Sequence, residues 1–127
     1  MRLDTTSDGG GLMAQYAVLI FERVPPGELP PEVMQRHMDL PERVAEQGGR
    51  IVAGLGLEPS GTATAIRSGG DRITDGPFIE TKEELAGVYV LEARDLDHAL
   101  ALARMTPIVE GGVEVRPLID FQVLEDG

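Results

Sequence analysis

The hydrophobic positions of the chain follow two periods, one typical of strands and the other typical of helices. Apolar runs or alternating apolar residues predict four strands, at residues 14–21, 51–57, 88–91 and 113–118. The polar stretch Ser68-Gly69-Gly70-Asp71 lies within residues 62–74 and is typical of a hairpin turn. The chain is therefore expected to contain four main strands and an inserted hairpin.

Two helices are predicted where apolar residues recur three and four positions apart. The first runs from about Pro31 to Gln47, and Pro41 interrupts it because proline lacks the N–H that would bond the preceding turn. This helix either kinks at Pro41 or restarts at Asp39. The second helix is capped by Asp95. The apolar stripes of the two helices consist of Val33, His37, Leu40 and Val44, and of Leu96, Ala99, Leu100 and Ala103.

The order of these elements, β-α-β, hairpin, β-α-β, predicts an α+β protein with a ferredoxin-like fold. In this fold an antiparallel sheet carries both helices on one face. The opposite face would remain bare, and its simplest cover is the same face of a second copy, so we expect a homodimer. Residues 13–127 form the expected domain, and residues 1–12, which are polar and rich in glycine, are expected to form a flexible tail.

Composition narrows the functional classes. The 127 residues include 22 acidic and 11 basic side chains, and the net charge of −11 opposes binding to nucleic acids or anionic membrane surfaces. The absence of cysteine excludes thiol catalysis and cysteine metal sites. The two histidines lack a metal-ligand spacing, and neither a metal nor another cofactor is expected. No apolar run reaches the roughly 20 residues that span a bilayer, and residues 1–12 lack the apolar core of a secretory signal, so we expect a cytoplasmic protein.

Residues 75–83, with the sequence DGPFIETKE, form the most distinctive segment. Asp-Gly-Pro favours a turn, and Thr81 with Glu84 has the spacing of a capped helical turn, under which Phe78 would pack. This segment resembles the signature of the DGPF branch of the YCII-related protein family. The resemblance spans about residues 16–118 and includes blocks at residues 54–59 (GLGLEP), 85–87 (LAG), 92–97 (EARDLD) and 113–117 (VEVRP).

This resemblance implies a ferredoxin-like fold that pairs into a dimeric α/β barrel, but it implies little about chemistry. Some relatives in the wider group act on small aromatic ring compounds through a histidine–aspartate pair, and others resemble accessory partners of alternative sigma factors. The catalytic relatives carry the aspartate after the second strand. This chain has Glu58-Pro59-Ser60-Gly61 there and no aspartate before Asp71. Asp75 is therefore the replacement to test.

His37 is the candidate catalytic base. It lies on the apolar stripe of the first helix and should point toward the sheet, where burial or a carboxylate can tune its pKa near neutrality. The alternative is a core histidine that bonds a backbone carbonyl. Asp75 would orient the ring of His37, or would instead bond its own backbone in the turn. His98 lies off the second apolar stripe and is expected to face water.

The expected substrate pocket lies between the first helix and the sheet. Gly54 and Gly56 fall on one face of the second strand, where the missing side chains let a ligand approach. Arg116 and Lys82 are candidate anchors for an anionic group, and the alternative for both is a surface ion pair. Phe78 is a further candidate for contact with a substrate.

These residues predict a protein with a small-molecule cleft. If it is an enzyme, we expect acid/base chemistry such as elimination or isomerisation of a small cyclic or carbonyl compound. The alternative is a non-enzymatic accessory or regulatory module, for example one associated with a sigma factor, whose acidic surface would meet a basic protein patch. The sequence leaves both hypotheses open.

Overall fold

The computed structural model describes residues 13–124 of the chain. The expected tail at residues 1–12 lies outside the described residues. The strands are β1 (Ala14–Glu22), β2 (Arg50–Gly56), β3 (Thr64–Ile66), β4 (Ile73–Asp75), β5 (Glu84–Ala93) and β6 (Gly111–Pro117). The helices are α1 (Pro31–Glu46) and α2 (Leu96–Ala103), and two 3-10 turns are η2 (Pro26–Glu28) and η3 (Ser60–Thr62).

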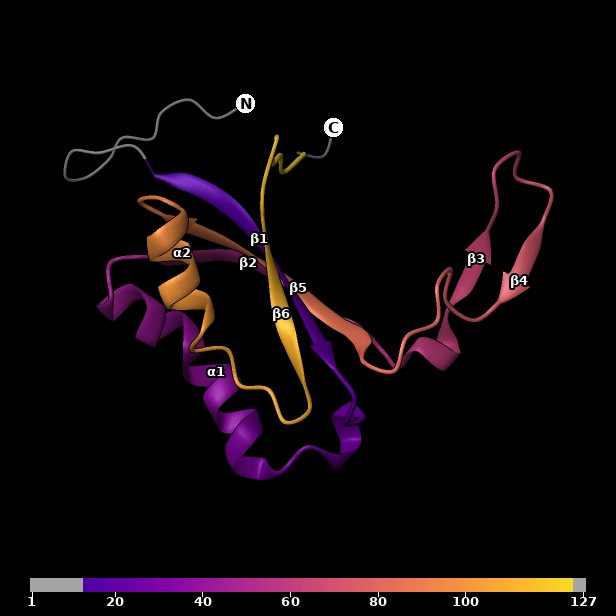
Figure 1. Cartoon of the computed structure of the whole chain (residues 1–127), viewed down its shortest axis with the longest axis horizontal. Helices are drawn as coiled ribbons and strands as arrows, with labels where there is room; N and C mark the ends of the chain where they lie inside the picture. Colours follow the sequence, from indigo (N-terminus) through magenta and orange to yellow (C-terminus); the bar gives the residue numbers. More distant parts are fainter. Residues whose placement is uncertain (1–12, 125–127) are drawn as a thin grey trace.

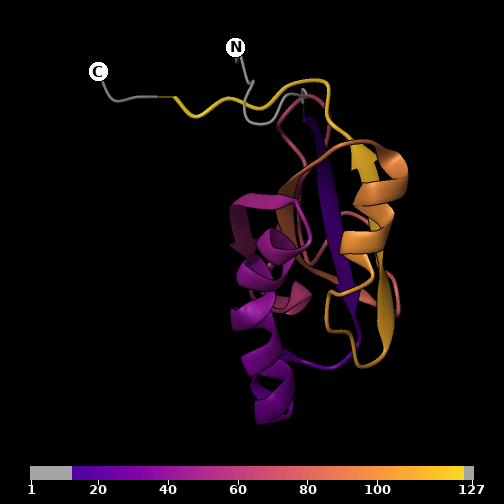
Figure 2. The ribbon, with the colours of Figure 1, turned by 90° about the vertical axis from the view of Figure 1, so that its left-hand side faces the viewer.

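The four long strands form one antiparallel sheet in the order β2-β5-β1-β6. The two strands joined by α1 are therefore separated by β5, and the two strands joined by α2 are separated by β1. Both helices lie on the same side of the sheet (Figures 1 and 2). The predicted α+β class is confirmed, and the arrangement is compatible with a ferredoxin-like fold.

The core lies between the helices and the sheet because alternate strand positions point toward the helices. In β1 and β5 these positions are apolar over most of their length, which gives the sheet one continuous hydrophobic face. The buried cluster consists of Tyr16, Val18, Leu40, Val44, Tyr89, Leu91, Ala93, Ala99, Leu102 and Ala103.

Two expectations about the helices are corrected. Helix α1 is continuous from Pro31 to Glu46 with Pro41 inside it, so the restart at Asp39 is wrong. In α2 the predicted cap is confirmed, since the Asp95 carboxylate accepts the backbone N–H of His98 at 2.9 Å. The buried side of α2, however, consists of His98, Ala99, Leu102 and Ala103. Leu96 and Leu100 are exposed instead.

Strands β3 and β4 form a separate two-stranded hairpin that extends away from the helices (Figure 1). Its predicted turn is confirmed, since Gly69 and Gly70 both adopt positive φ angles between the paired strands. The helical turn predicted at Thr81 is wrong. Strand β5 already begins at Glu84, and the carboxylate of Glu84 accepts the backbone N–H of Ser60 at 2.9 Å.

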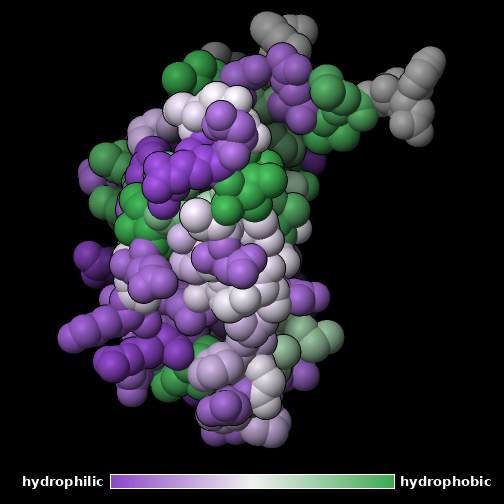
Figure 3. All heavy atoms as spheres, turned by 90° about the vertical axis from the view of Figure 1, so that its right-hand side faces the viewer, coloured by the Kyte–Doolittle hydropathy of each residue, from purple (hydrophilic) through white to green (hydrophobic). Residues whose placement is uncertain are grey.

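The face of the sheet opposite the helices carries an apolar centre. Leu19 pairs with Val88 across β1 and β5, and Ala17 pairs with Val90, so these four side chains share one face. They are only half-buried, whereas their neighbours on the helix side are buried. Apolar residues also reach the surface on the side of the hairpin, among hydrophilic ones (Figure 3). Within residues 13–124, neither helix covers this open face of the sheet.

Candidate functional site

A cavity of about 360 Å³ lies between the first half of α1 and the sheet. It occupies the place where the sequence predicts a cleft. Its walls come from β1, η2, α1, β2 and β5, and most of its lining is aliphatic. The lining side chains that carry polar groups are Glu22, His37 and Tyr89. An apolar cavity with a few converging polar groups is the usual form of a small-molecule site.

The cavity exists because the helix-facing side of the sheet lacks side chains there. Gly54 is paired with Tyr89, and Gly56 is paired with Gly87, so three glycines lie together on that face. A Cβ atom added at Gly56 would meet nothing within 4 Å, and one at Gly54 would make only ordinary contact with Tyr89. The two glycines predicted to leave room for a ligand therefore do lie at this cavity.

His37 points into this region from α1, as its position on the apolar stripe predicts. Its side chain is half-buried and lines the cavity. Burial lowers the pKa of His37 below its ordinary value, and the charge of Glu22 and the backbone carbonyl of Pro107 offset only part of this effect. The imidazole is therefore neutral at pH 7.

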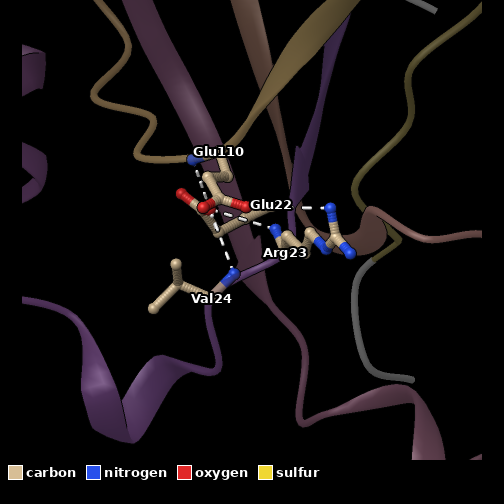
Figure 4. A network of polar contacts seen from close by, with 4 residues as sticks. All are labelled: Glu22, Arg23, Val24 and Glu110. Carbon is tan, nitrogen blue, oxygen red and sulfur yellow. Dashed lines mark hydrogen bonds and ion pairs between the residues drawn. The ribbon is translucent and has the colours of Figure 1, made fainter.

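Glu22, the last residue of β1, is the carboxylate at this site. It is 7% exposed, and its two oxygens accept four backbone N–H groups. Those of Arg23, Val24 and Glu110 are drawn in Figure 4. The donors are Val109 at 2.7 Å, Glu110 at 2.9 Å, Arg23 at 3.0 Å and Val24 at 3.1 Å. Burial alone would raise the pKa of Glu22, but these four hydrogen bonds lower it below the ordinary value. Glu22 thus stays ionised and joins the end of β1 to the loop before β6.

Tyr89 contributes its ring rather than its hydroxyl to the cavity. The hydroxyl oxygen lies 2.7 Å from Oγ1 of Thr106 in a buried hydrogen bond. Burial raises the pKa of Tyr89, and the bond to Thr106 offsets part of that rise. The phenol therefore stays protonated at neutral pH.

The other predicted site residues lie elsewhere. Asp75 is exposed at the end of β4 and is absent from the lining of the His37 cavity. Arg116 forms an ion pair with Glu114 on the open face of the sheet, and Lys82 is exposed in the loop before β5. The structure therefore brings His37 together with Gly54 and Gly56, but not with Asp75, Arg116 or Lys82 in one chain.

Phe78 lies at a second hollow, between the hairpin and the ends of β1 and β5. Its ring is 58% exposed rather than packed under a turn, and the guanidinium of Arg67 lies 4.2 Å from its centroid. This hollow is larger, about 890 Å³, and includes the carboxylates of Glu58, Glu80 and Glu84. It contains neither histidine, so the His37 cavity is the better candidate for acid/base chemistry.

His98 is buried, which corrects the expectation that it faces water. Its Nδ1 accepts the backbone N–H of Arg94 at 3.1 Å, and its Nε2 lies 2.9 Å from the carbonyl oxygen of Gln47. The side chain thus ties the start of α2 to the end of α1. This arrangement explains why α2 turns His98 inward and leaves Leu96 and Leu100 exposed.

Sequence reasoning missed Glu22 and Pro107. Glu22 ends an apolar strand and has the same alternation as Tyr16, Val18 and Ile20, so its inward direction was readable from the sequence. Its four donors and the carbonyl of Pro107 come from backbone that only the fold brings near. No side-chain motif marks them.

Two features of the described residues bear on other functional classes. Within residues 13–124, no three His, Asp or Glu side chains gather in a way that could hold a metal ion. Neither helix in that range is long and apolar enough to cross a membrane.

Comparison with known proteins agrees with the resemblance found in the sequence. The family model of the YCII-related domain matches residues 14–122. An uncharacterized protein of Rhizobium meliloti (strain 1021) is 37% identical over 92 residues, which cover 68% of this chain and 74% of that protein. The chain therefore belongs to the YCII-related domain family.

Proposed function

We propose that the protein binds a small molecule in the cavity between α1 and the sheet, and that His37 acts there as a general base. The observation that carries the proposal is a neutral, half-buried histidine in a mostly aliphatic cavity. A general base must be unprotonated at the working pH. The lowered pKa of His37 meets this condition.

The carbonyl of Pro107 supports a definite tautomer of His37. It acts on the pKa of His37 as a hydrogen-bond acceptor would, and Pro107 does not line the cavity. In the proposed arrangement the N–H of the neutral ring points to Pro107, and the other nitrogen keeps its lone pair for the ligand. This is the backbone-bonded histidine that the sequence offered as an alternative to catalysis, and here the same bond prepares the ring to act as a base.

The reaction class that fits is proton abstraction from carbon. His37 takes a proton from a carbon next to a carbonyl group, and the electron pair of the broken C–H bond forms an enolate. The enolate then either expels a leaving group on the neighbouring carbon, which is elimination, or regains the proton at another carbon, which is isomerisation. The substrate would be a small cyclic or carbonyl compound.

Exchange of carbon-bound hydrogen tests this step without a known substrate. Cyclohexanone in D₂O exchanges the hydrogens beside its carbonyl when a base removes them, and NMR measures the rate. We expect the protein to accelerate this exchange, and His37→Ala and His37→Gln to reduce the rate to that of buffer. Equal exchange by wild type and His37→Ala would contradict a role for His37 as the base.

Blocking the cavity provides a matched control. A Cβ at Gly56 and a Cβ at Gly61 would each meet nothing within 4 Å, but Gly56 lines the His37 cavity and Gly61 lines the second hollow. We expect Gly56→Val to abolish exchange and Gly61→Val to preserve it. The opposite pattern would move the active site to the hollow beside Phe78.

We further propose that two copies pair through the open face of the sheet, forming the dimeric barrel. The half-buried centre formed by Leu19, Ala17, Val88 and Val90 supports this, because an apolar face of this kind is stabilised by a matching face. Asp75 lies outside the His37 cavity of its own chain. It can therefore orient His37 only if the hairpin of the second copy brings its Asp75 to that cavity.

Sedimentation equilibrium tests the pairing. Leu19→Asp places a charge at the centre of the open face and should convert dimers to monomers. Met38→Asp makes the same change on the exposed side of α1, where the native side chain is 74% exposed, and should leave the mass unchanged. A wild-type protein that sediments as a monomer at micromolar concentration would contradict the dimer.

The alternative function is that of an accessory module that binds another protein, for example a sigma factor. Three isoleucines of the hairpin region favour it, because they are among the exposed apolar side chains: Ile66 at 62%, Ile73 at 63% and Ile79 at 71%. Under this hypothesis, the wild-type protein would not accelerate hydrogen exchange. It would bind a protein that carries a basic patch, and Ile66→Ser and Ile73→Ser would abolish that binding. Exchange activity that depends on His37 would count against it.

A further inference from the structure

The lining of the His37 cavity carries one negative charge and no compensating cation. Glu22 is the acidic residue among the lining residues. None of the described residues that line the cavity is lysine or arginine. The candidate anion anchors do not change this balance, because Arg116 is paired with Glu114 on the other face of the sheet and Lys82 lies in the loop before β5.

The charge of Glu22 is fixed by backbone groups rather than by a ligand. Its Oε1 accepts the N–H of Val109, and its Oε2 accepts those of Arg23, Val24 and Glu110. A carboxylate has about two lone-pair sites on each oxygen. Oε2 is filled by its three donors, whereas Oε1 has one donor. The negative charge of Glu22 is therefore held by backbone groups and stays next to the cavity.

From this arrangement we infer that the charge of Glu22 makes the cavity reject carboxylates and other anions and favour uncharged ligands over them. The inference rests on the proposed function, because it assumes that the cavity binds a ligand, and it adds the class of that ligand. An anion would be repelled by Glu22 in a lining of low polarity, where charges interact more strongly than in water. An uncharged ring compound with one carbonyl or hydroxyl group for His37 avoids this cost.

A series of ligands with one ring and different charges tests the inference. The probes are cyclohexanol and cyclohexanone, which are uncharged, with cyclohexanecarboxylate and cyclohexylammonium, which are charged at pH 7. Binding is measured by NMR titration of the wild-type protein at low ionic strength. We expect the uncharged probes to bind at least about tenfold more tightly than cyclohexanecarboxylate, a ratio that follows from a modest electrostatic difference. Cyclohexylammonium, which Glu22 does not repel, should also bind more tightly than cyclohexanecarboxylate.

Removal of the charge should relax the selectivity. Glu22→Gln keeps the size of the side chain, and we expect it to bring the affinity for cyclohexanecarboxylate to within about threefold of that for cyclohexanol. Glu32→Gln is the matched control, because Glu32 also belongs to the acidic residues near the start of α1 but does not line the cavity. It should leave the wild-type ratio unchanged.

A second variant covers the case in which Glu22→Gln does not fold. Met34 lines the cavity, yet its side chain is 44% exposed on α1, so lysine is tolerated there. Met34→Lys should raise the affinity for cyclohexanecarboxylate several-fold, and Met34→Gln should not.

The outcomes separate this inference from the proposed function. If no probe binds, or if Gly56→Val does not weaken binding, the ligand cavity itself is wrong. If the probes bind and Gly56→Val blocks them, but cyclohexanecarboxylate binds as tightly as cyclohexanol, the cavity stands and the rejection of anions is overturned.

Discussion

The layer between the helices and the sheet is tightly packed at one end and contains a cavity at the other. At one end, α2 and the second half of α1 close on Leu91 and Ala93 of β5, and Leu102 is 1% exposed. At the other end, the first half of α1 faces Gly54, Gly56 and Gly87, and a cavity remains. The same sheet supports both ends. The size of the side chains on its helix-facing side therefore decides where the protein is filled and where it is hollow.

The two histidines lie at opposite ends of this layer, and their surroundings differ. At the filled end, His98 has partners for both ring nitrogens in the backbone of Arg94 and Gln47. At the hollow end, His37 lines the cavity, and the backbone of Pro107 is the hydrogen-bonding group that acts on its pKa. A histidine with both nitrogens occupied holds structure together, whereas one with a free nitrogen is available for chemistry. Under the proposed function, His37 is therefore the base and His98 is a structural residue.

Truncation of an apolar side chain should distinguish the ends most strongly. Leu102→Ala removes three carbons from the filled end and leaves a cavity there, and we expect it to lower the free energy of unfolding by about 3 kcal/mol. Met34→Ala at the hollow end removes a side chain that is 44% exposed and should cost less than about 1 kcal/mol. Urea denaturation measures both. Similar losses in the two variants would show that the hollow end is packed as tightly as the other.

Adding one methyl group should sharpen the same contrast. A Cβ at Gly49 would overlap Leu102 and would lie 3.1 Å from the carbonyl oxygen of Glu92, so Gly49→Ala should lower the free energy of unfolding by about 1–3 kcal/mol. At Gly56 the new atom would meet nothing within 4 Å. Because alanine loses less conformational entropy than glycine on folding, Gly56→Ala should be neutral or stabilise by about 0.5 kcal/mol. Thermal denaturation compares the pair, and destabilisation of Gly56→Ala beyond 1 kcal/mol would contradict an open cavity.

Local patterns predicted most of the fold and part of this contrast. Period-two and helical spacing located the four main strands and both helices, because burial of one face imposes those periods. The same alternation placed Gly54 and Gly56 on one face of β2, and helical spacing turned His37 toward the sheet. These predictions need only the geometry of a single element.

The remaining features depend on contacts between distant segments. His98 is buried because its ring reaches the carbonyl of Gln47, 51 residues away in sequence. Glu22 is buried because N–H groups from the loop before β6 solvate its carboxylate. Backbone donors and acceptors carry no residue-specific signal, so the sequence did not reveal either site. The position of Asp75 relative to His37 was equally hidden, since the direction in which a hairpin extends is set by tertiary packing.

The pH dependence of stability provides the smallest expected effect and tests the hollow end alone. Burial lowers the pKa of His37 in the folded protein below its ordinary value of 6.5. The unfolded chain therefore binds a proton more readily, so the contribution of His37 to stability is complete above pH 6.5 and is lost as the pH falls through that value toward the lower pKa of the folded state. Glu22 affects stability in a lower pH range. Because its pKa is lowered, it stabilises the fold above about pH 4.5, and this contribution is lost on further acidification.

We expect the free energy of unfolding to decline between pH 7.5 and pH 5 in the wild type and to decline less in His37→Gln, as urea denaturation at each pH would show. Identical slopes for the two proteins would mean that His37 is as well solvated in the folded state as in the unfolded chain, and that it does not serve as a buried neutral base.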